Sequence, residues 1–379
     1  MVWRFSPELE MLRDMVRKMA AEVIAPRAAE IDRSEEFPWD IKELLQRQGI
    51  FSLPFPEYLG GCEQSHIAVC LAVEEIAHAC ASSSLILQVQ ALGATPILLV
   101  GTQAQKDKYF PPLASGEKLC AFGLTEPGAG SDAAAMATTA VLDGDAYILN
   151  GMKHFISNAT VADIFTIFVM TDRSQGTKGI SAFIVEKEYP GFSIGRVEKK
   201  MGIRGSPTAE IIFRDCRVPR ENLLGKEGDG FRIAMKTLDR SRPVIAAQAV
   251  GIAQAALDFA VNYAKERVQF GAPISQLQGI QFMLADMAAQ VEAARALTYH
   301  AASLAEEESP HLTYIAAAAK LMASDTAMRV TTEAIQVAGG YGYMVEFPAE
   351  RYMRDAKITQ IYEGTNQIQK LVIARQLLR

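Results

Sequence analysis

The stretch Arg354-Asp-Ala-Lys-Ile-Thr-Gln-Ile-Tyr-Glu-Gly-Thr-Asn-Gln-Ile-Gln369 is the most informative part of the chain. It places one carboxylate, Glu363, at a Tyr-Glu-Gly-Thr corner just before a helical run. The isoleucine, tyrosine and glycine around this carboxylate predict that little water reaches it. Loss of water raises the pKa of a carboxyl group, so Glu363 would act as a base near neutral pH. Taken alone, the stretch is equally compatible with a solvated glutamate at a helix N-terminus.

Composition limits the classes of protein open to this chain. It has 379 residues, 49% of them hydrophobic, which is enough for a large core in two or three domains. The net charge is -6 and the basic residues form no run, so nucleic acid is not an expected partner. Five cysteines without a C-x-x-C pair predict reduced thiols, and the spacing of the five histidines predicts no metal site.

The N-terminal residues show no secretory signal, because Trp3-Arg-Phe-Ser-Pro-Glu8 leads directly into a helix that contains acidic residues. No apolar run is expected to be long enough to span a bilayer. We therefore expect a cytoplasmic protein, and a mature organellar protein that has lost its transit peptide is the alternative.

Hydrophobic periodicity predicts a helical domain, a β domain and a helical bundle, over residues 1–116, 117–225 and 226–379. In the first domain Ser6 and Pro7 begin a helix, and Pro26 marks a kink or break. Long stretches rich in alanine and other small residues are typical of a bundle core. The further helices are predicted over 68–81 and 91–100 and, in the bundle, over 246–267, 278–308 and 312–337.

The middle domain is predicted from short β-type runs. Apolar stretches on either side of Asp143-Gly144 are a hairpin signal, and further runs follow at 164–170, 180–185 and 210–213. Several short strands at close spacing are typical of a small sandwich or barrel. The expected fold class is therefore α+β with several domains.

Two further segments carry groups suited to a flat polar ring. Phe122-Gly-Leu-Thr-Glu-Pro-Gly-Ala-Gly-Ser-Asp132 is a glycine-rich loop whose backbone N–H groups are able to face an anion or a heteroaromatic edge. In Gly151-Met-Lys-His-Phe-Ile-Ser-Asn158, an aromatic residue and a hydroxyl two positions later share one face of a strand. Taken singly, a loop of the first kind is usually a turn between strands, and the second segment is better explained as an ordinary strand with an exposed serine.

Together, the three segments resemble the acyl-CoA dehydrogenase family of FAD-dependent enzymes, almost from end to end of the chain. Leu124 to Asp132 matches one family signature, and the other is matched by Gln336-Val-Ala-Gly-Gly-Tyr-Gly342, Met353-Arg-Asp-Ala-Lys-Ile358 and Gln360-Ile-Tyr-Glu-Gly-Thr365. The resemblance implies α,β-dehydrogenation of an acyl-CoA in the degradation of fatty or other carboxylic acids. Glu363 would take the α proton while the flavin takes a hydride from the β carbon.

The resemblance also implies partners and site residues. Family members are typically tetramers, built as a dimer of dimers, and pass electrons to an electron-transferring flavoprotein. The implied FAD contacts within the subunit are Phe122, Leu124, Thr125, Ser131, Phe155, Ser157, Thr365 and Gln367. A second set of residues matches contacts with the FAD of a neighbouring subunit or lies beside such contacts. This set is Arg267, Gln269, Phe270, Gln278, Gln336, Gly339 and Gly340. The implied substrate contacts are Ser84, Gln88, Ser131, Arg242, Tyr362 and Gly364.

Three positions limit the choice of catalytic base and of acyl substrate. One subgroup of the family carries its base at the position that matches Ser241, which cannot serve as a base, and this favours Glu363. Neither Ser84 nor Gln88 is cationic, so a glutaryl-type substrate is disfavoured, whereas short to medium straight, branched or cyclic acyl groups all remain open. The alternative for Gln88 and Gln90 is plain helix surface, and the alternative for Arg242 is a surface arginine that caps a helix.

Other functions on the same fold remain as alternatives. An acyl-CoA oxidase would pass electrons to oxygen, but such enzymes usually carry a longer C-terminal region. An enoyl-CoA reductase or an electron-bifurcating partner would run the reaction toward saturation. A non-catalytic assembly protein is the most distant alternative, since such a protein would not need Glu363.

Overall fold

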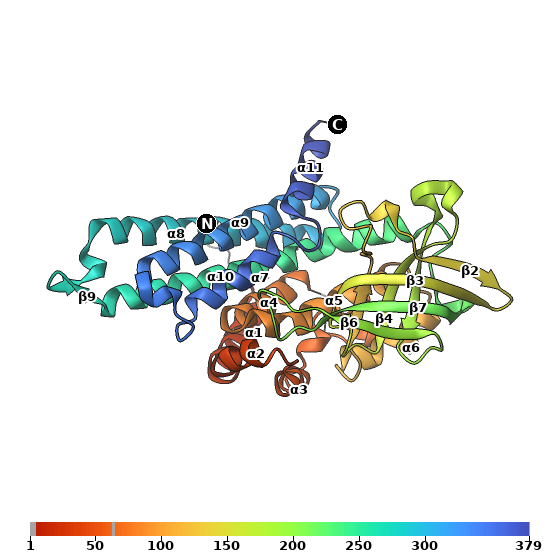
Figure 1. Cartoon of the computed structure of the whole chain (residues 1–379), viewed down its shortest axis with the longest axis horizontal. Coiled ribbons are helices and arrows are strands. Elements are labelled where there is room, and N and C mark those ends of the chain that lie inside the picture. Colours follow the sequence, from red (N-terminus) through yellow and green to blue (C-terminus); the bar gives the residue numbers. More distant parts are fainter. Residues whose placement is uncertain (1–4, 63–64, 379) are drawn as a thin grey trace.

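A computed structural model describes residues 5–62 and 65–378, so Trp3 and Arg4 of the predicted N-terminal segment lie outside the described part. It confirms the order of helices, β domain and helical bundle (Figure 1). The first helices are α1 (Pro7–Met19), α2 (Ala28–Ser34), α3 (Trp39–Arg47), α4 (His66–Ala79), α5 (Ala81–Val100) and α6 (Gln103–Ala114). Ser6 caps α1, and Pro26 lies in a short 3-10 segment, Ala25–Arg27, that interrupts the regular α-helix between α1 and α2.

Helix α5 begins ten residues before the predicted start at residue 91. Three serines, Ser82, Ser83 and Ser84, lie in its first turn. In the structure these serines are buried, and the Ser84 hydroxyl donates to the Ala81 carbonyl at 2.8 Å within the helix itself.

The β domain is one eight-stranded sheet with the order β6-β7-β3-β2-β4-β5-β8, and β1 pairs with β4 outside this path. Its two halves are joined by a single parallel pairing between Thr139 and Met170, which lets the sheet fold on itself. The predicted hairpin is present, as β2 and β3, whereas β1 and β6 were not predicted. The strands are β1 (Cys120–Gly123), β2 (Thr139–Asp143), β3 (Ala146–Ser157), β4 (Ile164–Met170), β5 (Ile180–Glu186), β6 (Phe192–Val197), β7 (Thr208–Pro219) and β8 (Leu223–Leu224).

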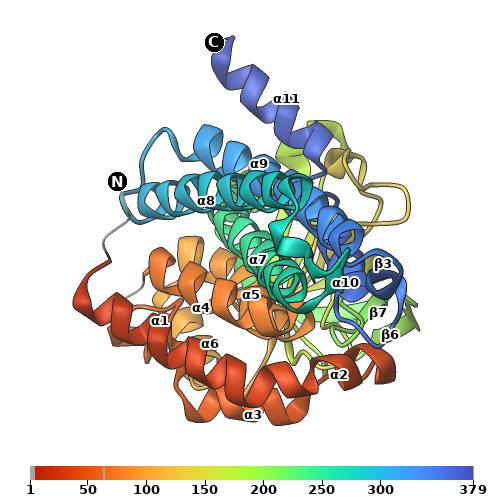
Figure 2. The same ribbon diagram turned by 90° about the vertical axis from the view of Figure 1, so that its left-hand side faces the viewer.

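The bundle extends away from the β domain along α7 (Figure 1). Helix α11 projects from the body of the molecule in both views (Figures 1 and 2), and Leu377 and Leu378 at its end are largely exposed. A two-stranded hairpin, β9 (Val268–Gln269) and β10 (Ala272–Pro273), lies at the far end of the bundle. The bundle helices are α7 (Gly230–Glu266), α8 (Gln278–Glu306), α9 (Leu312–Ala338), α10 (Ala349–Thr359) and α11 (Asn366–Leu377).

Helices α5 and α7 are long and apolar enough to cross a membrane by length and composition. The expectation that no run reaches this length was therefore wrong. However, 67% and 78% of their most apolar windows are buried inside the protein, as is usual for core helices.

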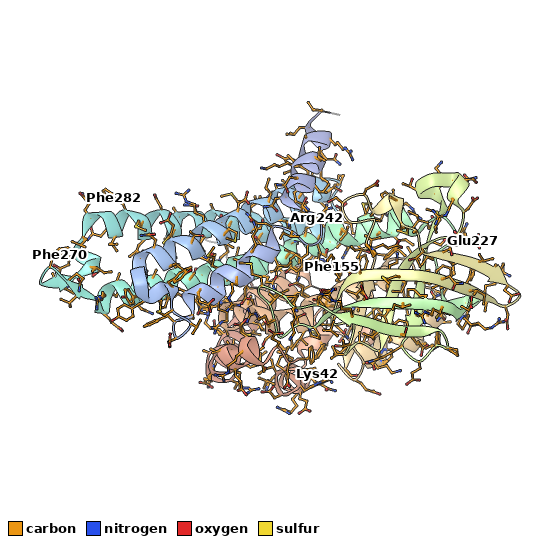
Figure 3. All side chains as sticks on the ribbon, in the orientation of Figure 1. Lys42, Phe155, Glu227, Arg242, Phe270 and Phe282 are labelled. Carbon is orange, nitrogen blue, oxygen red and sulfur yellow. The ribbon has the colours of Figure 1, made fainter. Side chains whose placement is uncertain are left out.

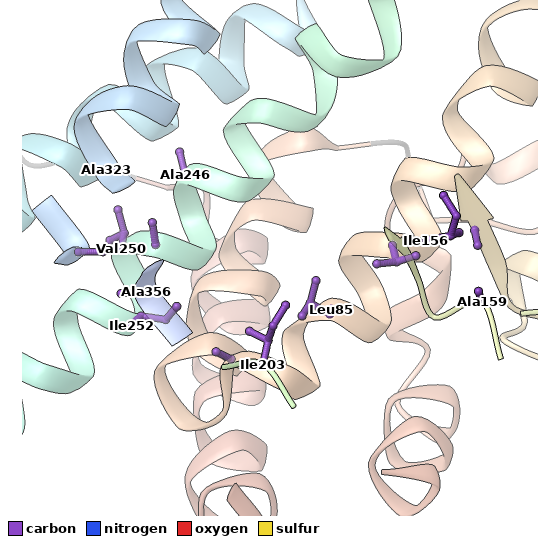
Figure 4. Close-up of a cluster of buried hydrophobic side chains, with 14 of the residues drawn as sticks. Leu85, Ile156, Ala159, Ile203, Ala246, Val250, Ile252, Ala323 and Ala356 are labelled. Atoms are coloured by element: carbon purple, nitrogen blue, oxygen red, sulfur yellow. The ribbon is translucent and has the colours of Figure 1, made fainter. Parts of the chain in front are cut away.

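The three parts share one continuous core (Figure 4). It joins Leu85 of α5, Ile156 of β3, Val250 of α7 and Ala356 of α10, all at most 2% exposed. The candidate site lies where these parts meet, so the packing that joins the domains also fixes its geometry.

Candidate active site

Glu363 lies in the short connection between α10 and α11, in a backbone conformation that residues other than glycine rarely adopt. Its φ is +52°, and the next residue, Gly364, has a φ of +93°. Left-handed backbone at a non-glycine residue costs free energy and persists where the surroundings enforce it. Here the Thr365 side chain caps α11, and the Asn366 N–H donates to the Gln360 carbonyl at 3.0 Å, so the corner is closed on both sides.

The Glu363 carboxyl group is partly buried and faces groups from two other helices. The Ser241 hydroxyl on α7 donates to its Oε2 atom. Burial raises the pKa of Glu363 to about 7, although the Ser241 hydrogen bond and the charges of Lys320 and Arg242 act in the opposite direction. The carboxyl group is therefore able to exchange a proton near neutral pH, and a freely solvated glutamate is not what the structure contains.

Arg242 is 3% exposed, so the alternative of a surface arginine was wrong. It lies at the centre of the molecule in Figure 3, and its Nη1 atom donates to Asp239. Its Nε atom is buried and has no hydrogen-bond partner among the described residues. An unpaired buried donor beside the Glu363 corner is suited to a polar ligand.

A chain of amide and hydroxyl groups lies behind Glu363. Tyr362 donates its hydroxyl proton to Gln248 Oε1 and accepts from Gln88 Nε2 at 3.3 Å. Gln248 Nε2 then donates to the Ser84 hydroxyl at 3.1 Å. Ser84 and Gln88 are thus buried beside Tyr362, and the helix-surface alternative was wrong for both Gln88 (2% exposed) and Gln90 (1%).

A narrow cavity of about 20 Å³ lies between α5 and α7, beside Ser241, the hydrogen-bond partner of Glu363. Gln88 and Ser241 supply polar groups to a wall that is otherwise largely aliphatic. Arg240 also lines the cavity, and its guanidinium lies 3.8 Å from Glu308. The lining residues are Pro54, His66, Val69, Gln88, Ala91, Leu92, Thr95, Leu98, Arg240, Ser241 and Val244.

Phe155 forms an exposed aromatic platform on β3. It is 60% exposed and has a φ of +57°, at a register shift in the pairing of β3 with β7. The alternation predicted from sequence holds beyond the bulge, because Ile156 is buried and Ser157 is again partly exposed. The His154 N–H donates to the Thr125 carbonyl at 2.8 Å, so the glycine-rich loop lies against this platform. An exposed aromatic ring beside polar backbone fits a flat heteroaromatic cofactor.

A second pocket lies at the opposite end of the bundle. Arg267, Gln269, Phe270, Gly339 and Gly340 all line it, and the Arg267 guanidinium lies 5.3 Å from the Tyr341 ring centroid. Phe270 is 91% exposed and lies far from Phe155 and Arg242 in Figure 3. Along α7 the rise from Arg242 to its C-terminal end is about 36 Å at 1.5 Å per residue. One chain therefore does not bring its two sets of predicted FAD residues together.

The remaining predicted residues fall into the same two regions. Phe122 lies in β1, Leu124, Thr125 and Ser131 lie in the loop that follows it, and Thr365 and Gln367 lie at the start of α11. Gln278 and Gln336 are exposed at the ends of α8 and α9, near the distal pocket but outside its lining.

The comparisons decide the family. Models of the acyl-CoA dehydrogenase N-terminal, middle and C-terminal domains match residues 6–117, 121–216 and 228–378. A short-chain specific acyl-CoA dehydrogenase of Clostridium acetobutylicum is 51% identical over all of both chains. The chain belongs to the acyl-CoA dehydrogenase family.

Solved structures agree with this assignment. Butyryl-CoA dehydrogenase of Megasphaera elsdenii is 48% identical, with a TM-score of 0.97 over all of both chains. A chain solved in work on the electron transferring flavoprotein of Acidaminococcus fermentans is 52% identical, with a TM-score of 0.98 over all of both chains. An acyl-CoA dehydrogenase of Bacillus anthracis complexed with FAD has a TM-score of 0.91 at 34% identity, over 99% of this chain and 67% of that one. The family is FAD-dependent, and the Phe155 platform fits that cofactor.

Sequence reasoning missed several polar residues that hold this acyl-CoA dehydrogenase site. Lys153 is fully buried and donates to Glu126 Oε1 at 2.6 Å and to the Leu124 carbonyl at 3.2 Å, which fixes the glycine-rich loop to β3. Lys320 is fully buried behind the Glu363 corner. A lone lysine in an alanine-rich run was the available signal for Lys320.

Sequence spacing also missed a group of His154, Glu198 and Glu210 on three segments of the β domain. Glu198 lies 3.8 Å from Nε2 of His154, and Glu210 lies 3.4 Å from Nδ1. The two ring nitrogens face different carboxylates, so each nitrogen lies next to its own acidic group.

Proposed function

We propose that this enzyme oxidises a short-chain acyl-CoA thioester to the trans-2-enoyl-CoA, with Glu363 as the base, and passes the electrons to an electron-transferring flavoprotein. The observation that carries the proposal is the Glu363 carboxyl group, whose pKa of about 7 leaves a large fraction ionised at neutral pH. A base of this strength is suited to removing a proton α to a thioester carbonyl.

The residues around Glu363 have separate tasks in this proposal. Ser241 orients the carboxylate through its hydrogen bond, and Arg242 offers its unpaired Nε atom to the substrate. The aliphatic wall of the cavity excludes water, which strengthens each electrostatic contact. Bound FAD supplies the acceptor for the hydride that leaves the β carbon. Phe155 and Ser157 would hold its ring system, with the loop at Thr125.

The two separate groups of FAD residues support a site shared between subunits. Arg267, Gln269 and Phe270 would reach the FAD of a neighbouring chain, while the platform at Phe155 holds the chain's own FAD. This requires a homo-oligomer, and we propose a tetramer built as a dimer of dimers. We further propose that the enzyme works in the cytoplasm.

The substrate class follows from the cavity and from the relatives. The names of the relatives specify short-chain acyl-CoA and butyryl-CoA, and we extend that range to this chain. Gln88 is neutral, and Arg240, which also lines the cavity, has Glu308 as a nearby counter-charge. A distal carboxylate on the substrate would therefore find no free cation here, which argues against a glutaryl-type acyl group.

The test is anaerobic bleaching of the enzyme-bound flavin by butyryl-CoA, followed at the flavin absorption band. The wild type should bleach, whereas Glu363→Gln should retain flavin and bind butyryl-CoA but lose most of the bleaching rate. Glu22→Gln, which changes an exposed carboxylate on the first domain, should bleach like the wild type. Bleaching by Glu363→Gln at the rate of the wild type would show that the base lies elsewhere.

The reverse direction is the second candidate, because the similar chain solved with a study of flavin-based electron bifurcation is 52% identical. The direction of the reaction depends on the redox potential of the flavin and on the electron-transfer partner. A flavin potential measured in the presence of substrate and product therefore distinguishes acyl-CoA oxidation from enoyl-CoA reduction.

A further inference from the structure

Lys320 is the buried cation nearest to the backbone of the Glu363 corner. It lies in the middle of α9 and its side chain is 0% exposed. Its Nζ atom donates to the Gly364 carbonyl at 2.9 Å and to Asn366 Oδ1 at 3.0 Å. A buried ammonium group is costly unless its donors are satisfied, so these contacts bind the lysine firmly to the corner.

The corner is held by a wider polar network between α9 and α11. The Asn366 amide donates to Asp325 Oδ1 at 2.7 Å and to the Ser324 hydroxyl at 2.9 Å. Gln369 Nε2 donates to the Gly364 carbonyl at 2.8 Å and to the Glu363 carbonyl at 3.3 Å. Both carbonyls of the left-handed corner therefore accept hydrogen bonds, and Lys320 supplies the charged donor.

We propose that Lys320 is a positioning residue for the base: it fixes the backbone that carries Glu363, and its charge favours the ionised carboxylate at neutral pH. This inference rests on the proposed role of Glu363 and goes beyond it, because it assigns the ionisation of the base to a residue on another helix.

The charges around the corner support this assignment. Arg242 on α7 faces Glu363 too, but Asp239 pairs with it and offsets its charge. Arg242 also acts on Lys320 and lowers its pKa, whereas Asp325 on α9 raises it more weakly. Helix α5 contributes the neutral Gln88. Burial lowers the pKa of Lys320 to about 7, while the charge of Glu363 acts to raise it. The two groups therefore titrate in the same pH range and influence each other.

The experiment is the pH profile of anaerobic flavin bleaching by butyryl-CoA, at saturating substrate, for Lys320→Met and Lys320→Gln. Both variants remove the charge, but glutamine keeps a hydrogen-bond donor. Lys42→Met is the matched control, because Lys42 is also buried (8% exposed) yet lies on α3, on the outer side of the first domain (Figure 3).

Without the nearby cation, the acid limb of the profile should move up by about one pH unit in both Lys320 variants. At pH 6 the rate should fall about tenfold, and above the shifted limb Lys320→Gln should approach the wild type. Lys42→Met should keep the limb of the wild type. These results would support the proposal.

Two results would overturn it. One is a Lys320 variant with an unmoved limb, whether its rate falls evenly at all pH values or not. The other is failure of both Lys320 variants to retain flavin while Lys42→Met retains it, which would assign Lys320 to folding. Glu363→Gln, measured in parallel, separates this inference from the proposed function: normal bleaching by that variant would reject Glu363 as the base.

Discussion

Replacing Glu363 by glutamine should make the protein more stable at alkaline pH, although it removes the proposed base. The carboxyl group has a pKa of about 7 in the folded chain, compared with an ordinary value of 4.5. Between these values the folded state binds more protons at this site than the unfolded state. The contribution of this carboxyl group to the free energy of unfolding is therefore present in full below pH 4.5 and is lost as the pH rises to 7.

The size of the effect follows from the same difference. A folded-state pKa of about 7, compared with 4.5, means that the ionised carboxyl group lowers the free energy of unfolding by at most about 3 kcal/mol at pH 8. The partial exposure of the carboxyl group makes the actual loss smaller. Glutamine has nearly the same shape but carries no charge, so it avoids this cost. Near pH 4.5 the two proteins should differ little, because the wild-type carboxyl group is then protonated in the folded state.

The assay is urea unfolding of the FAD-saturated protein, followed by tryptophan fluorescence at pH 5 and pH 8. Protein and FAD concentrations must be equal, since oligomerisation and ligand both contribute to apparent stability. The expected result is a gain for Glu363→Gln at pH 8 that largely disappears at pH 5. Equal stability of the two proteins at both pH values would refute the argument, as it would mean that Glu363 is as well solvated as Glu22.

Two further predictions concern the cofactor. Lys153→Met leaves Glu126 without its buried partner. We therefore expect a loss of about 3–5 kcal/mol in unfolding free energy and a lower flavin-to-protein absorbance ratio. A variant with full flavin content would show that the loop at Thr125 does not depend on this pair. Arg267→Ala should reduce flavin retention, measured by absorbance, and weaken assembly, measured by sedimentation, because it alters the distal pocket. Unchanged flavin content would remove the case for a site shared between subunits.

Much of this protein is determined by local patterns in its sequence. Helix periodicity, the hairpin turn at Asp143-Gly144 and the proline at position 26 placed most elements correctly, because each depends on neighbouring residues. The corner at Glu363 was also evident from sequence, since a carboxylate between apolar residues and glycine is a local feature.

Tertiary structure alone decided how that corner works. Lys320 lies 43 positions before Glu363, and Ser241 lies 122 positions before it, so no local pattern links them. Packing of α7, α9 and α11 brings these groups together in a space with little water, where burial and charge set the pKa of the carboxyl group. The same packing separates the platform at Phe155 from the pocket at Arg267, because a rigid helix of 37 residues runs between the two regions.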